Sequence, residues 1–303
     1  MNILVLGGTG LIGSRLVNAL AGEEYHIYVL TRGKKTSSDP FIHYVQYSPD
    51  DITDTSWHSE IPDDIEIIYN LAGATLNQKW TDSAKEDILN SRINVMKVLE
   101  RFVEENSPPK VLVNASAIGY YPVSEHVEYD EADVFTPNDF LQKVVHVWEN
   151  HAARFESYGI RVVRGRIGLV LSKDGGALPL MEKPYKLGVG GPIGSGRQWY
   201  SWIHIDDLVN AFLYTGADKT ISGPVNFTAP APLRQKQFSS YLSAALKRPD
   251  KFHTPKFMLN KVLGERAVLV VKGQKVMPNV LLEHHFKYLY PTLDLALENI
   301  YEK

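Results

Sequence analysis

Short apolar runs alternate with longer amphipathic segments through the first half of the chain. The runs are continuous, which is typical of strands that are buried on both faces of a parallel sheet. The segments between them carry apolar side chains at helical spacing, as at Ile88, Val95 and Leu99. This alternation predicts an α/β fold, a Rossmann-type doubly wound parallel sheet with right-handed crossovers. The predicted strands cover residues 2–6, 27–30, 43–47, 65–74, 110–116 and 160–164, and the main helices cover residues 83–104 and 139–158.

The pattern changes after residue 168. Glycine-rich segments at 175–177 and 188–196 are typical of loops, and short apolar runs between Gly and Pro follow from about Pro249. We therefore predict a large domain over residues 1–220, with its core at 1–168 and loops bordering a cleft at 169–207. A smaller C-terminal subdomain over residues 249–298 is expected on the substrate side.

Three glycines, Gly7, Gly10 and Gly13, separate the first strand from the first helical segment. In such a unit the first glycine permits a tight turn and the second lets a phosphate approach the backbone. The third allows the helix to pack closely on the sheet. The helix N-terminus adds unpaired N–H groups and a partial positive charge. The spacing therefore predicts a site for the pyrophosphate of a dinucleotide.

The residue that follows the second strand distinguishes between cofactors. An NAD site usually has Asp or Glu here, to accept hydrogen bonds from the ribose hydroxyls. This chain has Arg32, followed by Gly33, Lys34 and Lys35. A guanidinium can donate two parallel hydrogen bonds to a 2′-phosphate, so we expect NADP(H) as the cofactor. Lys34 and Lys35 are interpreted as a solvated basic loop.

Composition narrows the classes of function. Of the 303 residues 44% are hydrophobic and 22% charged, with a net charge of -3, so we expect a soluble enzyme without a nucleic-acid partner. Cys is absent, which excludes thiolate catalysis and Cys-ligated metals, and no metal site is predicted. The lack of Cys fits a reducing compartment, and Met1 runs into the first strand without a basic leader or an apolar span. We therefore expect a cytoplasmic protein with no membrane partner.

Four motifs resemble those of the extended short-chain dehydrogenases/reductases: Gly7-x-x-Gly10-x-x-Gly13, Asn70-Leu71-Ala72-Gly73, Ser116-Ala117-Ile118-Gly119-Tyr120 and Trp202-Ile203-His204-Ile205-Asp206-Asp207. Two more, Gly188 to Trp199 and Gly273 to Pro278, are similar to an atypical branch of NAD(P)-dependent epimerase family proteins. That branch includes relatives of human short-chain dehydrogenase family 39U and has a C-terminal domain of unknown function. The resemblance covers nearly the whole chain. It implies a fold and a cofactor but no particular substrate.

The resemblance also implies which residues bind the cofactor, and Asn94 would additionally hold a water of the proton relay through its main chain. These residues are Gly7, Thr9, Gly10, Leu11, Ile12, Gly13, Thr31, Arg32, Leu71, Ala72, Gly73 and Asn94. Dimers are common in the superfamily, so the resemblance leaves a homodimer open, through a helix pair that would here include residues 83–104 and 139–158.

One departure from the family pattern concerns catalysis. The superfamily uses a Tyr to move a proton and a Lys four residues later to lower the pKa of its phenol. No Tyr in this chain has Lys at that spacing; Phe140 and Val144 take the two expected positions. Ser116 remains as a candidate to hydrogen-bond a substrate carbonyl. Tyr120 is the best candidate for a replacement proton donor, although such an aromatic residue often only fills the core.

Two functions therefore stay open. The first is an NADP(H)-dependent oxidoreductase or nucleotide-sugar epimerase acting on an unidentified small molecule. The second is a protein that binds NADPH without turnover, as a sensor or scaffold. Arg197, in the glycine-rich loop over the cleft, either binds an anionic group or is an ordinary surface arginine.

Overall fold

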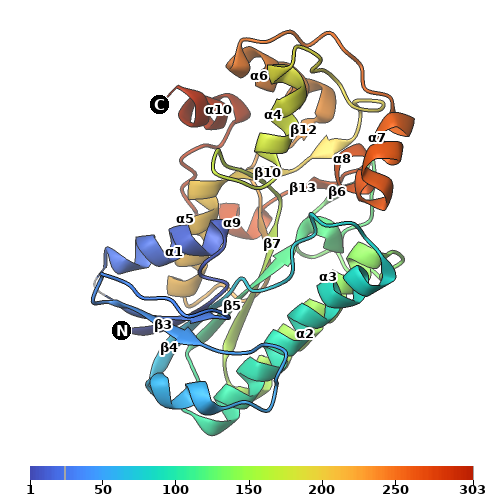
Figure 1. The fold of residues 1–303 in the computed structure, drawn as a ribbon. Helices are drawn as coiled ribbons and strands as arrows, with labels where there is room; N and C mark the ends of the chain where they lie inside the picture. The colour runs from blue at the N-terminus through green and yellow to red at the C-terminus, as the bar shows by residue number, and fades with distance from the viewer. Residues whose placement is uncertain (24, 303) are drawn as a thin grey trace.

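The computed structural model describes residues 1–23 and 25–302. Its centre is a sheet of seven parallel strands in the order β11-β7-β5-β4-β1-β2-β3 (Figure 1). The chain adds strands outward from β1 to β3 and then returns to place β4 on the other side of β1. The predicted Rossmann-type doubly wound sheet is thus confirmed. The strands are β1 (Asn2–Leu6), β2 (His26–Thr31), β3 (Ile42–Gln46), β4 (Ile65–Asn70), β5 (Val111–Ala117), β7 (Arg161–Ile167) and β11 (Gly223–Phe227).

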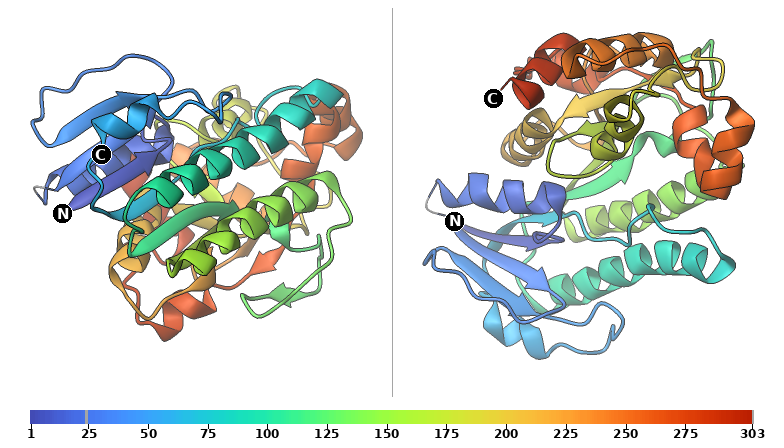
Figure 2. Two further views of the ribbon diagram at one scale, coloured as in Figure 1. Left: turned by 90° about the horizontal axis from the view of Figure 1, so that it is seen from below. Right: turned by 45° about the horizontal axis from the view of Figure 1, so that its top comes forward.

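Helices cover both faces of this sheet. The helices α1 (Leu11–Ala21) and α5 (Ile205–Ala217) contact each other on one face, and α2 (Asp82–Glu105) and α3 (Phe140–Ala153) do so on the other (Figure 2). The Thr81 side chain caps α2 by accepting a hydrogen bond from the Ala84 N–H, and Asp139 caps α3 in the same way. Among the described residues, no helix combines the length and the apolar character needed to cross a membrane.

A second core lies beyond the carboxyl ends of the strands. It joins α4 (Leu178–Lys186), α6 (Gln235–Leu246) and α10 (Leu293–Tyr301), and its buried side chains include Phe238 and Leu297. Four short strands border it, in two pairs: β8 (Leu169–Leu171) with β10 (Trp202–His204), and β9 (Trp199–Tyr200) with β12 (Leu233–Arg234).

The domain division predicted at residue 220 falls just before β11, which is an outer strand of the large sheet. Within the predicted C-terminal subdomain, α10 packs against α6, so the second core takes residues from both sides of position 249. The C-terminal region also contains α7 (Lys256–Leu263), the 3-10 helix η4 (Gly264–Ala267), α8 (Val268–Val271), α9 (Asn279–Glu283) and β13 (Lys275–Val276). The strand β13 pairs with β6 (Glu128–Tyr129).

Two polar contacts link the α7–α8 region to the start of α2. The Lys85 ammonium lies 2.6 Å from a carboxylate oxygen of Glu265, and Arg266 donates a hydrogen bond of 3.4 Å to the Asn77 side chain. The C-terminal region therefore reaches across to the segment between β4 and α2, and encloses one side of the strand ends.

Candidate functional site

The glycine turn joins β1 to α1 at the point where the strand order reverses. Gly7 has a φ of +76°, in the left-handed region, and a Cβ there would lie 2.7 Å from the Leu71 carbonyl carbon. A Cβ on Gly13 would lie 2.2 Å from the Gly7 oxygen, so α1 can approach the turn only if this residue has no side chain. Both positions require glycine for the fold itself.

Gly10 differs from the other two glycines. It is exposed at the N-cap of α1, no side chain caps the helix there, and a Cβ would meet nothing nearer than the Gly7 oxygen at 3.4 Å. The fold would accept a side chain at this position. Its absence leaves bare backbone beside the unpaired N–H groups of an eleven-residue helix, which is the environment that a pyrophosphate needs. The residues present therefore fit a dinucleotide.

The neighbours of the turn at positions 9, 11 and 12 lie at the start of α1. Thr9 is exposed, while Leu11 and Ile12 are half-buried. The Leu11 side chain would contact a Cβ on Gly175 or Gly176, so the loop after β8 lies against it. Arg15, one turn further along α1, strengthens this approach with ion pairs to Asp174 and Asp206.

The carboxyl end of β2 carries Thr31 and Arg32. Thr31 is buried and Arg32 is exposed. The Arg32 carbonyl accepts a hydrogen bond from the Gln46 side chain, whereas its guanidinium forms no ion pair with any carboxylate in residues 1–23 and 25–302. The guanidinium is therefore available to an anionic ligand at the edge of the glycine turn.

The end of β4 is held by two buried asparagines. Asn70 donates to the Asn114 side chain of β5 at 2.7 Å and accepts from the Ala72 N–H at 3.1 Å. The Leu71 N–H donates to the Leu6 carbonyl at 2.9 Å. These bonds fix residues 71–73 against the glycine turn, so the predicted cofactor residues at the ends of β1 and β4 lie side by side and make up the predicted cofactor groove.

Ser116 ends β5 but does not present its proton to open space. It is buried, and its hydroxyl donates to the Glu149 carboxylate at 2.6 Å. Arg166 in turn forms a bidentate ion pair with Glu149, in which its Nε and Nη2 donate to the two carboxylate oxygens at 2.8 and 2.9 Å. Burial lowers the pKa of Arg166, but its hydrogen bonds and attraction to Glu149 raise the pKa above the usual value. A hydroxyl that donates to a carboxylate offers a ligand its lone pairs and no proton.

The two neighbouring tyrosines have different surroundings. Tyr121 donates to the Asn226 side chain at 2.8 Å and accepts from Arg166 at 2.9 Å, and burial raises the pKa of its phenol. Tyr120 instead packs against an imidazole and a guanidinium. The His146 ring stacks on the Tyr120 ring with centroids 4.3 Å apart, and the Arg166 guanidinium carbon lies 3.4 Å from the Tyr120 ring centroid. No hydrogen bond of the Tyr120 hydroxyl occurs within the described part of the chain. The structure thus leaves Tyr120 as the phenol without a committed partner.

The helix α3 places apolar side chains where the superfamily has its Tyr and Lys. Phe140 packs edge-on against Trp80, with ring centroids 5.4 Å apart, and Val144 is buried. The turn at Gly119 faces the next positions along the helix: a Cβ there would lie 3.8 Å from both Leu141 and Val145. In either register, whether Phe140 and Val144 or Leu141 and Val145 are compared with the family's Tyr and Lys, the two positions on α3 carry no group that can move a proton.

Two further candidates have ordinary surroundings. Asn94 is half-buried on α2. Arg197 is largely exposed and pairs with Glu125 at 3.1 Å, which favours the surface interpretation. Sequence reasoning missed Glu149 and Arg166, although an arginine near the carboxyl end of β7, a strand of the central sheet, is an available signal.

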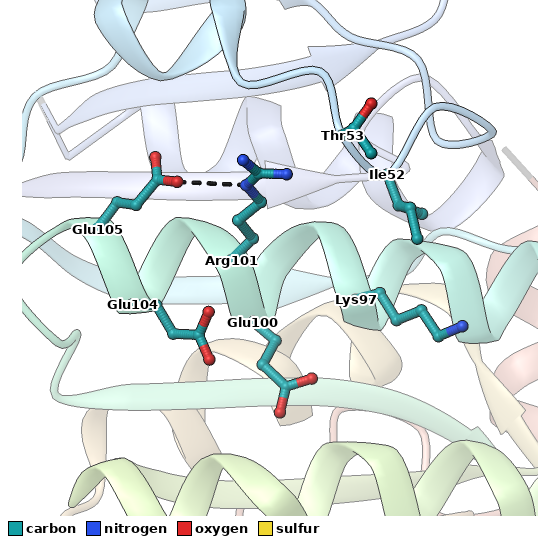
Figure 3. A pocket seen from close by; sticks show the side chains of 7 residues that line it. All are labelled: Ile52, Thr53, Lys97, Glu100, Arg101, Glu104 and Glu105. Carbon is teal, nitrogen blue, oxygen red and sulfur yellow. Dashed lines mark hydrogen bonds and ion pairs between the residues drawn. The ribbon is translucent and has the colours of Figure 1, made fainter.

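A shallow hollow on the outer face of α2 lies apart from this groove (Figure 3). It is formed by the C-terminal half of α2, which runs back toward the amino ends of the strands. Charged side chains dominate it, and Arg101 and Glu105 pair with each other at 3.2 Å. The helix α2 is one of the two helices considered for a homodimer, which stays a prediction. The lining residues are Ile52, Thr53, Lys97, Glu100, Arg101, Glu104 and Glu105.

Together, the doubly wound sheet, the glycine turn and the fixed end of β4 define an NAD(P)-binding protein of the Rossmann type. The chain belongs to the NAD dependent epimerase/dehydratase family, whose pattern matches residues 3–225, and a domain of unknown function matches residues 254–300. The predicted resemblance to this family with its C-terminal domain is confirmed.

Three similar proteins illustrate this membership. An epimerase family protein of Staphylococcus haemolyticus is 47% identical over 298 residues, which is 98% of both chains. The human epimerase family protein SDR39U1, solved with NADPH, is 31% identical with a TM-score of 0.89 over 100% of both chains. A nucleoside-diphosphate sugar epimerase of Corynebacterium glutamicum is 26% identical with a TM-score of 0.78, over 99% of this chain and 58% of its own.

Proposed function

We propose that this protein binds NADP(H) in preference to NAD(H), along the groove formed by the glycine turn, Arg32 and residues 71–73. The observation that carries the proposal is the exposed Arg32 guanidinium at the end of β2, where a carboxylate would be expected for NAD and where no carboxylate of the described residues pairs with it. The human relative SDR39U1, solved with NADPH, supports the same choice.

The test of this proposal is calorimetric titration of NADPH and NADH. Removing a charged hydrogen-bond donor costs about 1.5–3 kcal/mol, so Arg32→Ala should weaken NADPH binding by that amount and leave NADH nearly unaffected. Lys34→Ala, which removes an exposed charge two residues away, is the matched control and should change NADPH binding much less. Equal losses for both cofactors in the Arg32 variant would contradict the proposal.

For the reaction, we propose an oxidoreductase or epimerase acting on a carbonyl or sugar-like substrate. The bound cofactor would supply hydride transfer, and the protein would orient it. Tyr120 is the side chain that would move the proton at the substrate oxygen, because its phenol is the one without a hydrogen-bond partner among the candidates. Ser116, whose proton points to Glu149, would accept a hydrogen bond from the ligand.

A sensor or scaffold that binds NADPH without turnover is the second candidate. The apolar Phe140 and Val144, together with the donation of the Ser116 proton to Glu149, favour it. A panel of aldehydes, ketones and nucleotide sugars, followed by NADPH absorbance, separates the two. Turnover that falls by about 10²- to 10⁴-fold in Tyr120→Phe would support the enzyme. Tight NADPH binding without turnover on any substrate would support the sensor.

A further inference from the structure

Arg92 lies between α2, α3 and the turn that follows β4. Its Nη1 donates to the Ile88 carbonyl at 2.7 Å and to the Ala74 carbonyl at 3.3 Å. Its guanidinium carbon lies 4.9 Å from the centroid of the Trp148 ring on α3. These contacts hold the side chain in one place, at the level where β4 ends.

Within residues 1–23 and 25–302, the charge of Arg92 has no carboxylate counterion. Burial lowers the pKa of its guanidinium to about 10, so it is still protonated at neutral pH. It forms no ion pair with a carboxylate of the described residues, and both of its hydrogen bonds use a single nitrogen. Arg166, the other arginine packed against an aromatic ring of this region, is fully paired with Glu149. A half-buried cation is costly unless an anion or several acceptors compensate it.

The second terminal nitrogen of this guanidinium, Nη2, lies beside Gly73, one of the predicted cofactor residues after β4. A Cβ on Gly73 would lie 3.1 Å from the Arg92 Cζ and 3.3 Å from its Nη2, and Gly73 is exposed. Ser91 accepts a hydrogen bond from the Ala74 N–H at 2.9 Å, which fixes the same turn. Ligands of parallel α/β sheets lie at these carboxyl ends, so Nη2 is next to the space that a bound dinucleotide would cross.

Arg92 and Arg32 stand on opposite sides of the glycine turn. The strand order β5-β4-β1-β2 places the end of β2, with Arg32, on one side of β1, and the end of β4, with Gly73, on the other. A dinucleotide whose 2′-phosphate meets Arg32 and whose pyrophosphate lies at the turn would extend its nicotinamide half toward Arg92.

We propose that Arg92 binds the phosphate and ribose oxygens of the nicotinamide half of the cofactor. It would thereby supply, from α2, the cation that Val144 on α3 cannot supply. Trp148, one turn after Val144 on α3, provides the surface against which the guanidinium packs. This inference rests on the NADP(H) binding proposed above.

The test compares two ligands that share the 2′-phosphate but not the nicotinamide half, NADPH and adenosine 2′,5′-bisphosphate. Arg92→Met removes the charge and keeps most of the length, and it should weaken NADPH by about 10- to 100-fold while changing the bisphosphate by less than about twofold. Arg92→Lys should recover part of the NADPH loss. Arg32→Ala, in contrast, should weaken both ligands.

Thermal melting of each variant shows whether it is folded, and Arg92→Lys gives the same comparison if Arg92→Met does not fold. Equal losses for the two ligands in the Arg92 variants would mean that the residue only holds the turn, and would overturn the inference. Unchanged NADPH affinity would overturn it as well. A wild-type protein that binds neither ligand would instead remove the proposed NADP(H) function, which keeps the two failures distinct.

Discussion

At the scale of single residues, the buried ion pair of Glu149 and Arg166 organises the region around Ser116. Both side chains are 3–4% exposed, and their hydrogen bonds reach Ser116 and Tyr121. Such a pair need not add stability compared with apolar residues, but removal of one partner leaves a buried charge uncompensated. Ser116 donates its proton to Glu149, while Tyr121 accepts from Arg166 and donates its own proton to Asn226. Neither hydroxyl therefore has a proton left for a ligand.

We expect Glu149→Gln to lower the free energy of unfolding by about 3–5 kcal/mol, because Arg166 would stay buried without its carboxylate. Chemical unfolding measures this loss. Glu125→Gln is the matched control, since its pair with Arg197 is exposed to 34% and 74%, and it should cost less than about 1 kcal/mol. If the two variants were equally stable, Glu149 would not be acting as a buried counterion.

The surroundings of Ser116 show what residue-level sequence reasoning can reach. The motif predicts a serine at the end of β5, and the structure places it there. Its partner Glu149 lies on α3, and Arg166, which pairs with Glu149, lies on β7. Both are far from Ser116 in the sequence, so no local spacing connects them. The direction of a hydroxyl proton depends on such distant partners, which is why the predicted role of Ser116 as a donor did not anticipate Glu149.

At the scale of elements, the start of α1 provides most of the predicted contacts to the cofactor. Its first turn combines a glycine that the fold requires with one that it does not. Gly13 lies against the backbone of Gly7, whereas Gly10 faces open space at the N-cap. Gly13 is therefore required for the fold, whereas Gly10 is expected to be required for ligand binding.

The separation gives a prediction for two variants. Gly10→Val should leave the free energy of unfolding within about 1 kcal/mol of wild type, because its extended backbone and open surroundings accept a side chain. NADPH binding, measured by calorimetry, should be lost, since the branched side chain stands where the pyrophosphate approaches. Gly13→Ala should instead lower stability by about 1–3 kcal/mol through its clash with Gly7. A folded Gly10 variant with wild-type NADPH affinity would place the phosphate elsewhere.

The order of elements was the part of the fold most accessible to prediction. Continuous apolar runs predict β1, β2, β4 and β5, because strands covered on both faces need no polar side. The helix ends follow from Thr81 and Asp139. The second core was not predicted, because α6 and α10 have only part of their surfaces buried and lie far apart in the sequence. Their pairing depends on tertiary packing that a local pattern does not contain.

At the scale of the whole molecule, the protein has two hydrophobic cores. The large sheet holds the groove, while α4, α6 and α10 form the second core beyond the strand ends. We expect Leu297→Ala, at a side chain 1% exposed on α10, to lower the free energy of unfolding by about 2–5 kcal/mol. NADPH affinity of the folded variant should be unchanged, because the groove belongs to the first core.

The control for this prediction lies on the same helix. Leu295 is 41% exposed, and Leu295→Ala should cost less than about 1 kcal/mol in the same denaturant titration. A Leu297 variant that loses NADPH binding while it remains folded would contradict this prediction, because it would show that the second core shapes the cofactor groove.

The way in which the second core is assembled has a consequence for biosynthesis. The large sheet is complete once β11 has been made, but the second core needs α10, which follows α6 only after the α7–α9 region. On the ribosome, the part of the first core that does not depend on Leu281 and Phe286 can therefore fold and meet the dinucleotide while the apolar faces of α4 and α6 still lack their partner. In a nascent chain these apolar faces would stay exposed until α10 has emerged as far as Tyr301. We expect a chaperone to bind the chain mainly during this interval.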